Sequence, residues 1–354
     1  MEGLTLVRVA SWARLPQLAW LCALMAAMCL AALDVAAQGE FENKVRISQE
    51  GQFRIIESNG WPDHAPGAFP RRGNPNRATP QQYRFRVPLN PVAAPNGGGS
   101  PPGRWFWGVA LNGVPFEAGT AEAWNNDPRS GWRYEAATGF LDLGLDEHHA
   151  HVQPSGAYHY HAMPTGLLQR RGGDAGRMVQ IAWAADGFPV YSDRAHRRAE
   201  DAGSELAVMR SSYVLKKGVR PASAGGPGGN YDGRFTEDFE YAPGSGDLDA
   251  CNGRFGVTPE FPRGTYYYCI TAAFPFVPRK WHGTPDQSFA KAGPPPGGVP
   301  GQRPGSPGRP SPSGQNPQGP PPQGHKGVPP GAQNGVPPGA QNGAPLPPPN
   351  RPVK

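Results

Sequence analysis

The sequence has little charge, little cysteine and hardly any stretch with apolar residues at helical spacing. Only 18% of its 354 residues are charged and four are cysteine, whereas 49 are glycine and 45 are proline, more than a quarter of the chain. This much glycine and proline excludes one compact domain over the whole length. The scarcity of helical spacing excludes a mainly helical protein.

Acidic residues are absent from residues 291–354, which contain six Lys or Arg and therefore carry the whole formal net charge of +6. Residues 38–290 are neutral, with 26 basic and 26 acidic side chains. Binding to nucleic acid through a folded basic face needs an excess of Lys and Arg on that domain. Nucleic acid is therefore not an expected partner.

Aromatic residues are also absent from residues 291–354, where the octapeptide GVPPGAQN at 327–334 is repeated at 335–342. A segment of this composition has nothing with which to build a core. We therefore predict a disordered C-terminal tail over 291–354. It would act as a spacer or make weak contacts with a cell-envelope or extracellular polymer.

The N-terminal segment has the order of a secretory signal. Arg8 and Arg14 precede an apolar run over 18–33, and small residues at 35–37 are followed by Gln38. This order predicts a signal peptide over 1–37, cleaved after Ala37, and a periplasmic or secreted protein with no membrane span in the mature chain. The alternative is an uncleaved membrane anchor, for which the apolar run is slightly short.

Cleavage there would leave two cysteines, Cys251 and Cys269. An oxidising compartment favours a disulfide between them. Its loop of 18 residues would stabilise the fold by roughly 3 kcal/mol in the chain-entropy model. The alternative is a free thiol pair that serves as metal ligands or as a redox centre.

Between the two ends, short runs rich in β-branched and aromatic residues alternate with Gly, Pro and Asn-Gly turns. This pattern predicts an all-β domain over 38–290, mainly antiparallel, sandwich- or barrel-like and loop-rich, with minor helix. The clearest strands are expected at 45–48, 52–57, 82–87, 104–111, 157–161, 178–184, 211–215 and 265–270. Only residues 194–210 have a weak helical pattern.

The run Tyr158-His159-Tyr160-His161 resembles the signature of the bacterial YHYH-domain family. Further motifs resemble that family in the same order over about residues 43–280: SNGWPDH at 58–64, LNGVPF at 111–116, AHVQP at 150–154, ADGFPVY at 185–191 and GDLDACNGR at 246–254. The resemblance implies an exported domain, but it does not imply a particular reaction. His148 and His149 occupy positions where this resemblance leads us to expect Asn, so we do not assign them as ligands.

Five of the nine histidines lie within residues 148–161. Alternate residues of a strand share a face, so His159 and His161 are expected side by side, about 6 to 7 Å apart. The turn-forming run at 153–156 can fold His151 back beside them. These three histidines are therefore candidate ligands for a transition metal, zinc or copper.

Two further residues are candidates to complete this site. His64 follows Asp63 in a loop, and Asp186 lies on the Ala185-Asp186-Gly187 turn. The latter would serve as a carboxylate ligand or as an acceptor that orients an imidazole. The alternative is that the histidines are structural and bind no metal. Tyr158 and Tyr160 are expected to be core rings.

Apart from the histidine cluster, an acid-rich segment contains Asp247, Asp249 and Asn252, whose side-chain oxygens alternate much as in calcium loops. The spacing departs from the helix-loop-helix calcium motif and lacks its distal Glu. Calcium is thus possible there, and turn capping is the alternative.

The sequence favours a metalloenzyme and a metal carrier about equally. The competing class is a non-catalytic extracellular module that binds glycan or protein. Such a module would use surface tryptophans as stacking platforms, for which the candidates are Trp105, Trp107, Trp124 and Trp132.

Overall fold

The computed structural model describes residues 41–95, 99–100, 105–173, 176–222 and 225–291. The predicted signal peptide and, apart from Lys291, the predicted tail lie outside these residues. Within the described part, no helix is both long enough and apolar enough to cross a membrane.

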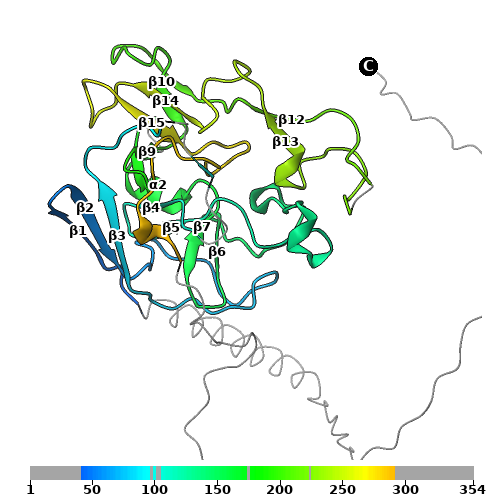
Figure 1. The fold of residues 1–354 in the computed structure, drawn as a ribbon. Coiled ribbons are helices and arrows are strands. Elements are labelled where there is room, and N and C mark those ends of the chain that lie inside the picture. Colours follow the sequence, from blue (N-terminus) through cyan, green and yellow to red (C-terminus); the bar gives the residue numbers. More distant parts are fainter. Residues whose placement is uncertain (1–40, 96–98, 101–104, 174–175, 223–224, 292–354) are drawn as a thin grey trace, which may run out of the picture. The chain divides into compact units, whose positions relative to one another are not determined.

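The first three strands of the chain make up a three-stranded antiparallel sheet. Its strands are β1 (Val45–Glu50), β2 (Phe53–Ser58) and β3 (Tyr83–Pro88), in the order β1-β2-β3. Figure 1 shows it in blue to cyan, beside the larger sheet. The three strands confirm the first three predicted from the sequence.

The larger sheet has eight strands in the order β14-β15-β9-β8-β4-β5-β7-β6. Most neighbours in it are antiparallel, whereas β5 pairs with β7 and β9 with β15 in parallel. The strands are β4 (Gly108–Ala110), β5 (Pro115–Phe116), β6 (Ala150–Val152), β7 (Tyr158–Tyr160), β8 (Gln180–Ala184), β9 (Pro189–Tyr191), β14 (Gly253–Gly256) and β15 (Thr265–Cys269). The mainly antiparallel, loop-rich β fold is therefore confirmed.

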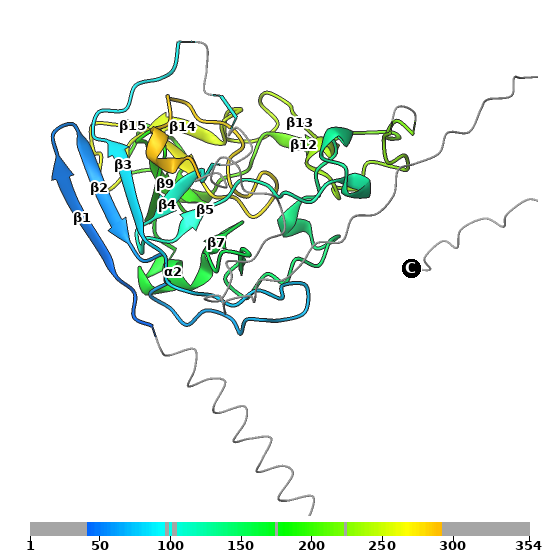
Figure 2. The same ribbon diagram turned by 60° about the horizontal axis from the view of Figure 1, so that its bottom comes forward.

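Helix is minor in the described part. It consists of α2 (Thr165–Arg170) and the short 3-10 turns η1 (Trp124–Asn126), η2 (Pro128–Ser130), η3 (Ala136–Thr138), η5 (Thr236–Asp238) and η6 (Gln287–Phe289). The two remaining hairpins are β10 (Arg194–His196) with β11 (Leu206–Val208), and β12 (Tyr213–Leu215) with β13 (Phe239–Tyr241). Figure 2 shows β12 and β13 on the side of the large sheet away from β1–β3.

The core lies between the three-stranded sheet and the large sheet. Ile56 and Phe85 of the small sheet join one buried cluster with residues of the large sheet. Tyr158 and Tyr160 belong to this cluster and are 1% and 0% exposed. Both are therefore core rings, as expected. Burying large aromatic side chains such as these contributes about 1.5 to 3 kcal/mol each.

The helix expected at residues 194–210 is wrong, because this segment forms the β10–β11 hairpin. Ala195 is buried in a second core cluster beside Tyr191 and Met209. The Nδ1–H of His196 donates to the carbonyl of Ser204 at 3.0 Å across the loop. Tertiary packing of alternate residues thus outweighs a weak helical pattern.

The disulfide expected between Cys251 and Cys269 is absent, and both thiols are free. Gly253 pairs with Tyr268 in the β14–β15 ladder, which places Asn252 opposite Cys269. Cys251 lies in the turn before β14 and packs on the main core cluster, whereas Cys269 packs in the second. The two thiols therefore contact different clusters and are not bridged.

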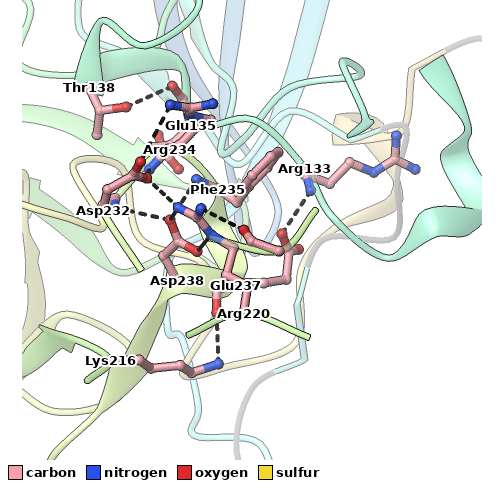
Figure 3. A network of polar contacts seen from close by, with 12 residues as sticks. Arg133, Glu135, Thr138, Lys216, Arg220, Asp232, Arg234, Phe235, Glu237 and Asp238 are labelled. Carbon is pink, nitrogen blue, oxygen red and sulfur yellow. Dashed lines mark hydrogen bonds and ion pairs between the residues drawn. The ribbon is translucent and has the colours of Figure 1, made fainter. Parts of the chain in front are cut away.

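A buried ion-pair network, centred on Arg220 and Asp238, fixes the loops around β12 and β13 (Figure 3). The guanidinium donates to both oxygens of Asp238, at 2.7 and 2.6 Å, and also to Asp232. A neighbouring pair joins Arg279 to buried Glu135 at 2.5 Å. Each buried carboxylate here faces a guanidinium.

Candidate metal centre

The hairpin of β6 and β7 lies at one edge of the large sheet, and its register places His151 opposite His159. The turn between them closes through hydrogen bonds from the N–H of Gln153 to Ala157 O and from the N–H of Gly156 to Gln153 O. The predicted hairpin is thus confirmed. His161 follows β7 two residues after His159 and therefore shares its face.

The three imidazoles meet through their Nε2 atoms. The Nε2 of His161 lies 3.1 Å from that of His151 and 3.0 Å from that of His159. His159 and His161 are 1% and 3% exposed, whereas His151 is half-buried. In the described part of the chain, this is the one group of three or more metal-ligating side chains whose ligand atoms converge.

Hydrogen bonds fix the orientation of two of the rings. The Nδ1–H of His151 donates to Leu143 O at 2.9 Å, and the Nδ1–H of His159 donates to Ala157 O at 3.1 Å. A proton on Nδ1 leaves the Nε2 lone pair free and directed at the other two rings. The Nδ1 of His161 is buried and has no partner among the described residues.

Burial lowers the pKa of His159 and of His161 well below the usual value. The neighbouring imidazoles, Lys291 and, for His161, Arg279 lower these pKa values further. Both rings are therefore neutral at neutral pH. A neutral imidazole is the form that binds a metal ion.

Three Nε2 lone pairs at this separation repel one another unless a proton or a cation lies between them. Zinc binds imidazole nitrogens at about 2.0 to 2.1 Å in a tetrahedron, which places two such nitrogens about 3.3 Å apart. The observed 3.0 and 3.1 Å are close to that separation. The residues present thus fit a transition metal with imidazole ligands.

One side of the triad opens on a cavity of about 460 Å³ that is lined by both polar and apolar residues. The side chain of Glu117 enters it, with Oε2 3.3 Å from the Nε2 of His159. Gln153 and Lys291 contact the two oxygens of that carboxylate. Sequence reasoning missed these three residues, because only the pairing of β5 with β7 brings Glu117 to the hairpin.

The structure does not bring His64 to the triad. Its Nε2 accepts a hydrogen bond from the Tyr160 hydroxyl at 2.7 Å, and its Nδ1–H donates to Ala65 O. Tyr160 alternates with the histidines along β7, so His64 lies across the strand from the triad. Burial lowers the pKa of His64. His64 thus anchors its loop to the tyrosine face of β7.

Asp186 also lies apart from the triad. Its carboxylate accepts hydrogen bonds from the Tyr268 hydroxyl at 2.5 Å and from the N–H of Gly283 at 2.8 Å. The residue is buried, which raises the pKa of Asp186 to about 6. This carboxylate therefore holds the segment around residue 283 and does not orient any imidazole of the triad.

The acid-rich turn uses its side chains locally. Asp247 accepts from the backbone and guanidinium of Arg210, and Asp249 accepts from the N–H groups of Cys251 and Gly253. Asn252 adopts a left-handed backbone with φ of 54°. This geometry corresponds to turn capping, the alternative to the calcium loop.

His148 and His149 also bond away from the triad. The Nδ1 of His148 lies 2.9 Å from the Thr165 hydroxyl oxygen, and the Nδ1–H of His149 donates to Met163 O at 2.8 Å. Neither ring joins the converging Nε2 atoms.

The four tryptophans that the sequence offers as stacking platforms differ in burial. Trp107 is completely buried, and the other three are half-buried. Trp105 packs edge-on against Trp281, while Trp124 and Trp132 both pack against Phe235. Trp107 is therefore a core ring and not a stacking platform, whereas glycan stacking on the three half-buried rings stays a prediction.

Comparison with known proteins assigns a family to this chain. The profile of the family described as YHYH protein matches residues 84–283, more than half of the chain, and this segment contains the whole histidine triad. No curated protein matches the chain, and no solved structure does. The ordered motifs and the matched segment together show that the chain belongs to the YHYH protein family.

Proposed function

We propose that this chain is an exported metal-binding domain in which His151, His159 and His161 hold zinc or copper through their Nε2 atoms. The observation that carries this proposal is the convergence of three Nε2 atoms on one face of a hairpin, with that of His161 3.1 and 3.0 Å from those of His151 and His159. Two of these rings have their Nδ1–H bonded to backbone carbonyls, the arrangement common to histidine metal ligands.

The donor set favours a transition metal over calcium or magnesium. Imidazole nitrogen suits zinc, copper, iron and nickel, whereas calcium and magnesium take oxygen ligands. Neutral, buried His159 and His161 lose no proton when they bind a cation. The rigid hairpin also holds their rings in place, which reduces the entropy lost on binding.

The cavity beside the triad supports a role in metal-assisted chemistry. A three-histidine metal with an open position acts as a Lewis acid and activates bound water. In this chain the cavity gives a polar ligand access to the triad on the side of Glu117, Gln153 and Lys291. A carrier that only stores the metal does not need such a cavity.

Export is supported by the order of basic residues, apolar run and small residues before Gln38. The predicted tail, rich in proline and without acidic residues, would then link the domain to the cell envelope or hold it at a distance.

Metal content tests the proposal directly. The chain from residue 38 onward, expressed in the periplasm, should contain about one equivalent of zinc or copper by mass spectrometry. A His159→Ala/His161→Ala variant should contain less than a tenth of that while its circular dichroism spectrum stays unchanged.

His149→Asn is the matched control. It removes a histidine two positions from His151, and Asn tolerates the left-handed backbone, with φ of 56° at residue 149. This variant should keep its metal. A wild-type protein that is isolated without metal and fails to bind added zinc or copper would contradict the proposal.

A further inference from the structure

Glu117 is an acidic side chain directed at the triad from the cavity. Its Oε2 lies 3.3 Å from the Nε2 of His159, and only 19% of its side chain is exposed. This separation is close to the ligand-to-ligand distance of about 3.3 Å in a tetrahedral site. The carboxylate thus lies where a further metal ligand would lie relative to His159.

The pairing of β5 with β7 explains this position. Phe116 pairs with Tyr160 in parallel, and the two rings pack together at 5.4 Å on one face. Side chains alternate along a strand, so Glu117 points to the opposite face, which is the face of the histidines. A hydrogen bond from the N–H of Glu117 to Tyr160 O fixes this register.

Two donors hold the carboxylate in that orientation. The Lys291 ammonium contacts Oε1 at 2.5 Å, and the side-chain amide of Gln153 donates to Oε2 at 2.6 Å. The lysine is itself largely buried, with its ammonium 4.7 Å from the centre of the Phe106 ring. A carboxylate fixed by two partners loses little further freedom when it meets a cation.

We propose that Glu117 is the fourth protein group of the metal site and supplies the negative charge on the side that the imidazoles leave open. This inference rests on the proposed function. Three neutral imidazoles bring no charge to a divalent cation, whereas a carboxylate lowers its free energy in a poorly hydrated site. Zinc accepts carboxylate oxygen together with histidine nitrogen.

Metal affinity and a ligand-sensitive spectrum test this assignment. Glu117→Gln retains the shape of the side chain and removes its charge. In the full mature chain, it should weaken zinc binding about 10- to 100-fold, as measured by competition with a chelator. It should also shift the visible absorption bands of the protein loaded with cobalt(II), which report the ligand set. Glu122→Gln is the matched control, because Glu122 lines the same cavity and is exposed.

Glu117→Asp keeps the charge and withdraws it by one methylene, so its affinity should fall between those of wild type and Glu117→Gln. This second variant also gives a result if Glu117→Gln does not fold. Wild-type affinity and an unchanged cobalt spectrum in either variant would overturn the role of Glu117 and leave the histidine site intact. Failure of the wild-type protein to bind zinc would overturn the histidine site as well.

Discussion

Two buried polar clusters of this molecule differ in how their members are paired. Around Arg220, the guanidinium faces Asp238 and Asp232, and backbone N–H groups complete the partners of Asp238. In the triad, three imidazole nitrogens face one another, and the Nδ1 of His161 has no described partner. Opposite charges that face each other need no further group between them, whereas converging lone pairs need a cation or a proton.

The pKa values follow the same division. Burial acts to raise the pKa of Asp238, but hydrogen bonds from Arg220 and from backbone amides outweigh it and leave this pKa lowered. In the triad, burial and the neighbouring basic groups act in the same direction, so the pKa values of His159 and His161 fall. The carboxylate is thus held charged for ion pairing, and the imidazoles are held neutral for ligation.

The largest expected effect comes from breaking the paired cluster. Asp238→Ala leaves the buried Arg220 guanidinium with only Asp232 as a charged partner and should destabilise the fold by about 3 to 5 kcal/mol. Zinc affinity of the folded fraction should not change. Urea unfolding and chelator competition measure the two quantities. Asp201→Ala, which removes an exposed ion pair with Arg198, should cost less than about 1 kcal/mol. Equal losses in both variants would contradict the structural role of the network.

An intermediate case is Asp186, whose partners are neutral donors. Its pKa of about 6 lies above the value of about 3.9 for an unfolded Asp. The folded state therefore binds this proton more tightly, and its contribution to stability is present below pH 4 and lost as pH rises through 6. From pH 7.5 to pH 4, this carboxyl should add about 2 kcal/mol to the free energy of unfolding.

Asp186→Asn isolates that contribution. Between pH 7.5 and pH 4, the difference in unfolding free energy between wild type and variant should change by about 2 kcal/mol, in favour of wild type at low pH. Denaturant unfolding at pH 4, 5, 6 and 7.5 measures it. A difference that is constant with pH would show that Asp186 is ionised throughout this range.

The smallest expected effect on stability comes from the triad itself. His161→Phe replaces an imidazole, whose Nδ1 has no partner among the described residues, with an apolar ring of similar shape. The metal-free protein should therefore change in stability by no more than about 1 kcal/mol. The same variant should lose its metal. A loss above about 3 kcal/mol in the metal-free protein would place the triad in the same class as the Arg220 network.

Local patterns in the sequence predicted the triad and about half of the strands. The alternation Tyr158-His159-Tyr160-His161 separates two faces of one strand, and the turn at 153–156 predicts the return of His151. Both rest on neighbours close in sequence, where strand periodicity determines which side chains meet.

Features that depend on distant pairing were beyond local pattern. Glu117 reaches the triad only because β5 joins β7 in parallel. The two cysteines are separated because Cys251 packs on the main core cluster and Cys269 in the second. His64 was expected near the triad because it is a histidine in a loop, but a hydrogen bond from Tyr160 holds it across the strand. The residue type nominates a candidate ligand, whereas the strand register determines on which face of the sheet its side chain lies.

The central claim is that three histidines of one hairpin bind a metal through Nε2. X-ray absorption at the zinc edge of the zinc-loaded protein tests it most directly. The account predicts three imidazole nitrogens at about 2.0 Å, with any remaining ligand an oxygen. A sulfur ligand, or a first shell of oxygens with at most one imidazole, would contradict it.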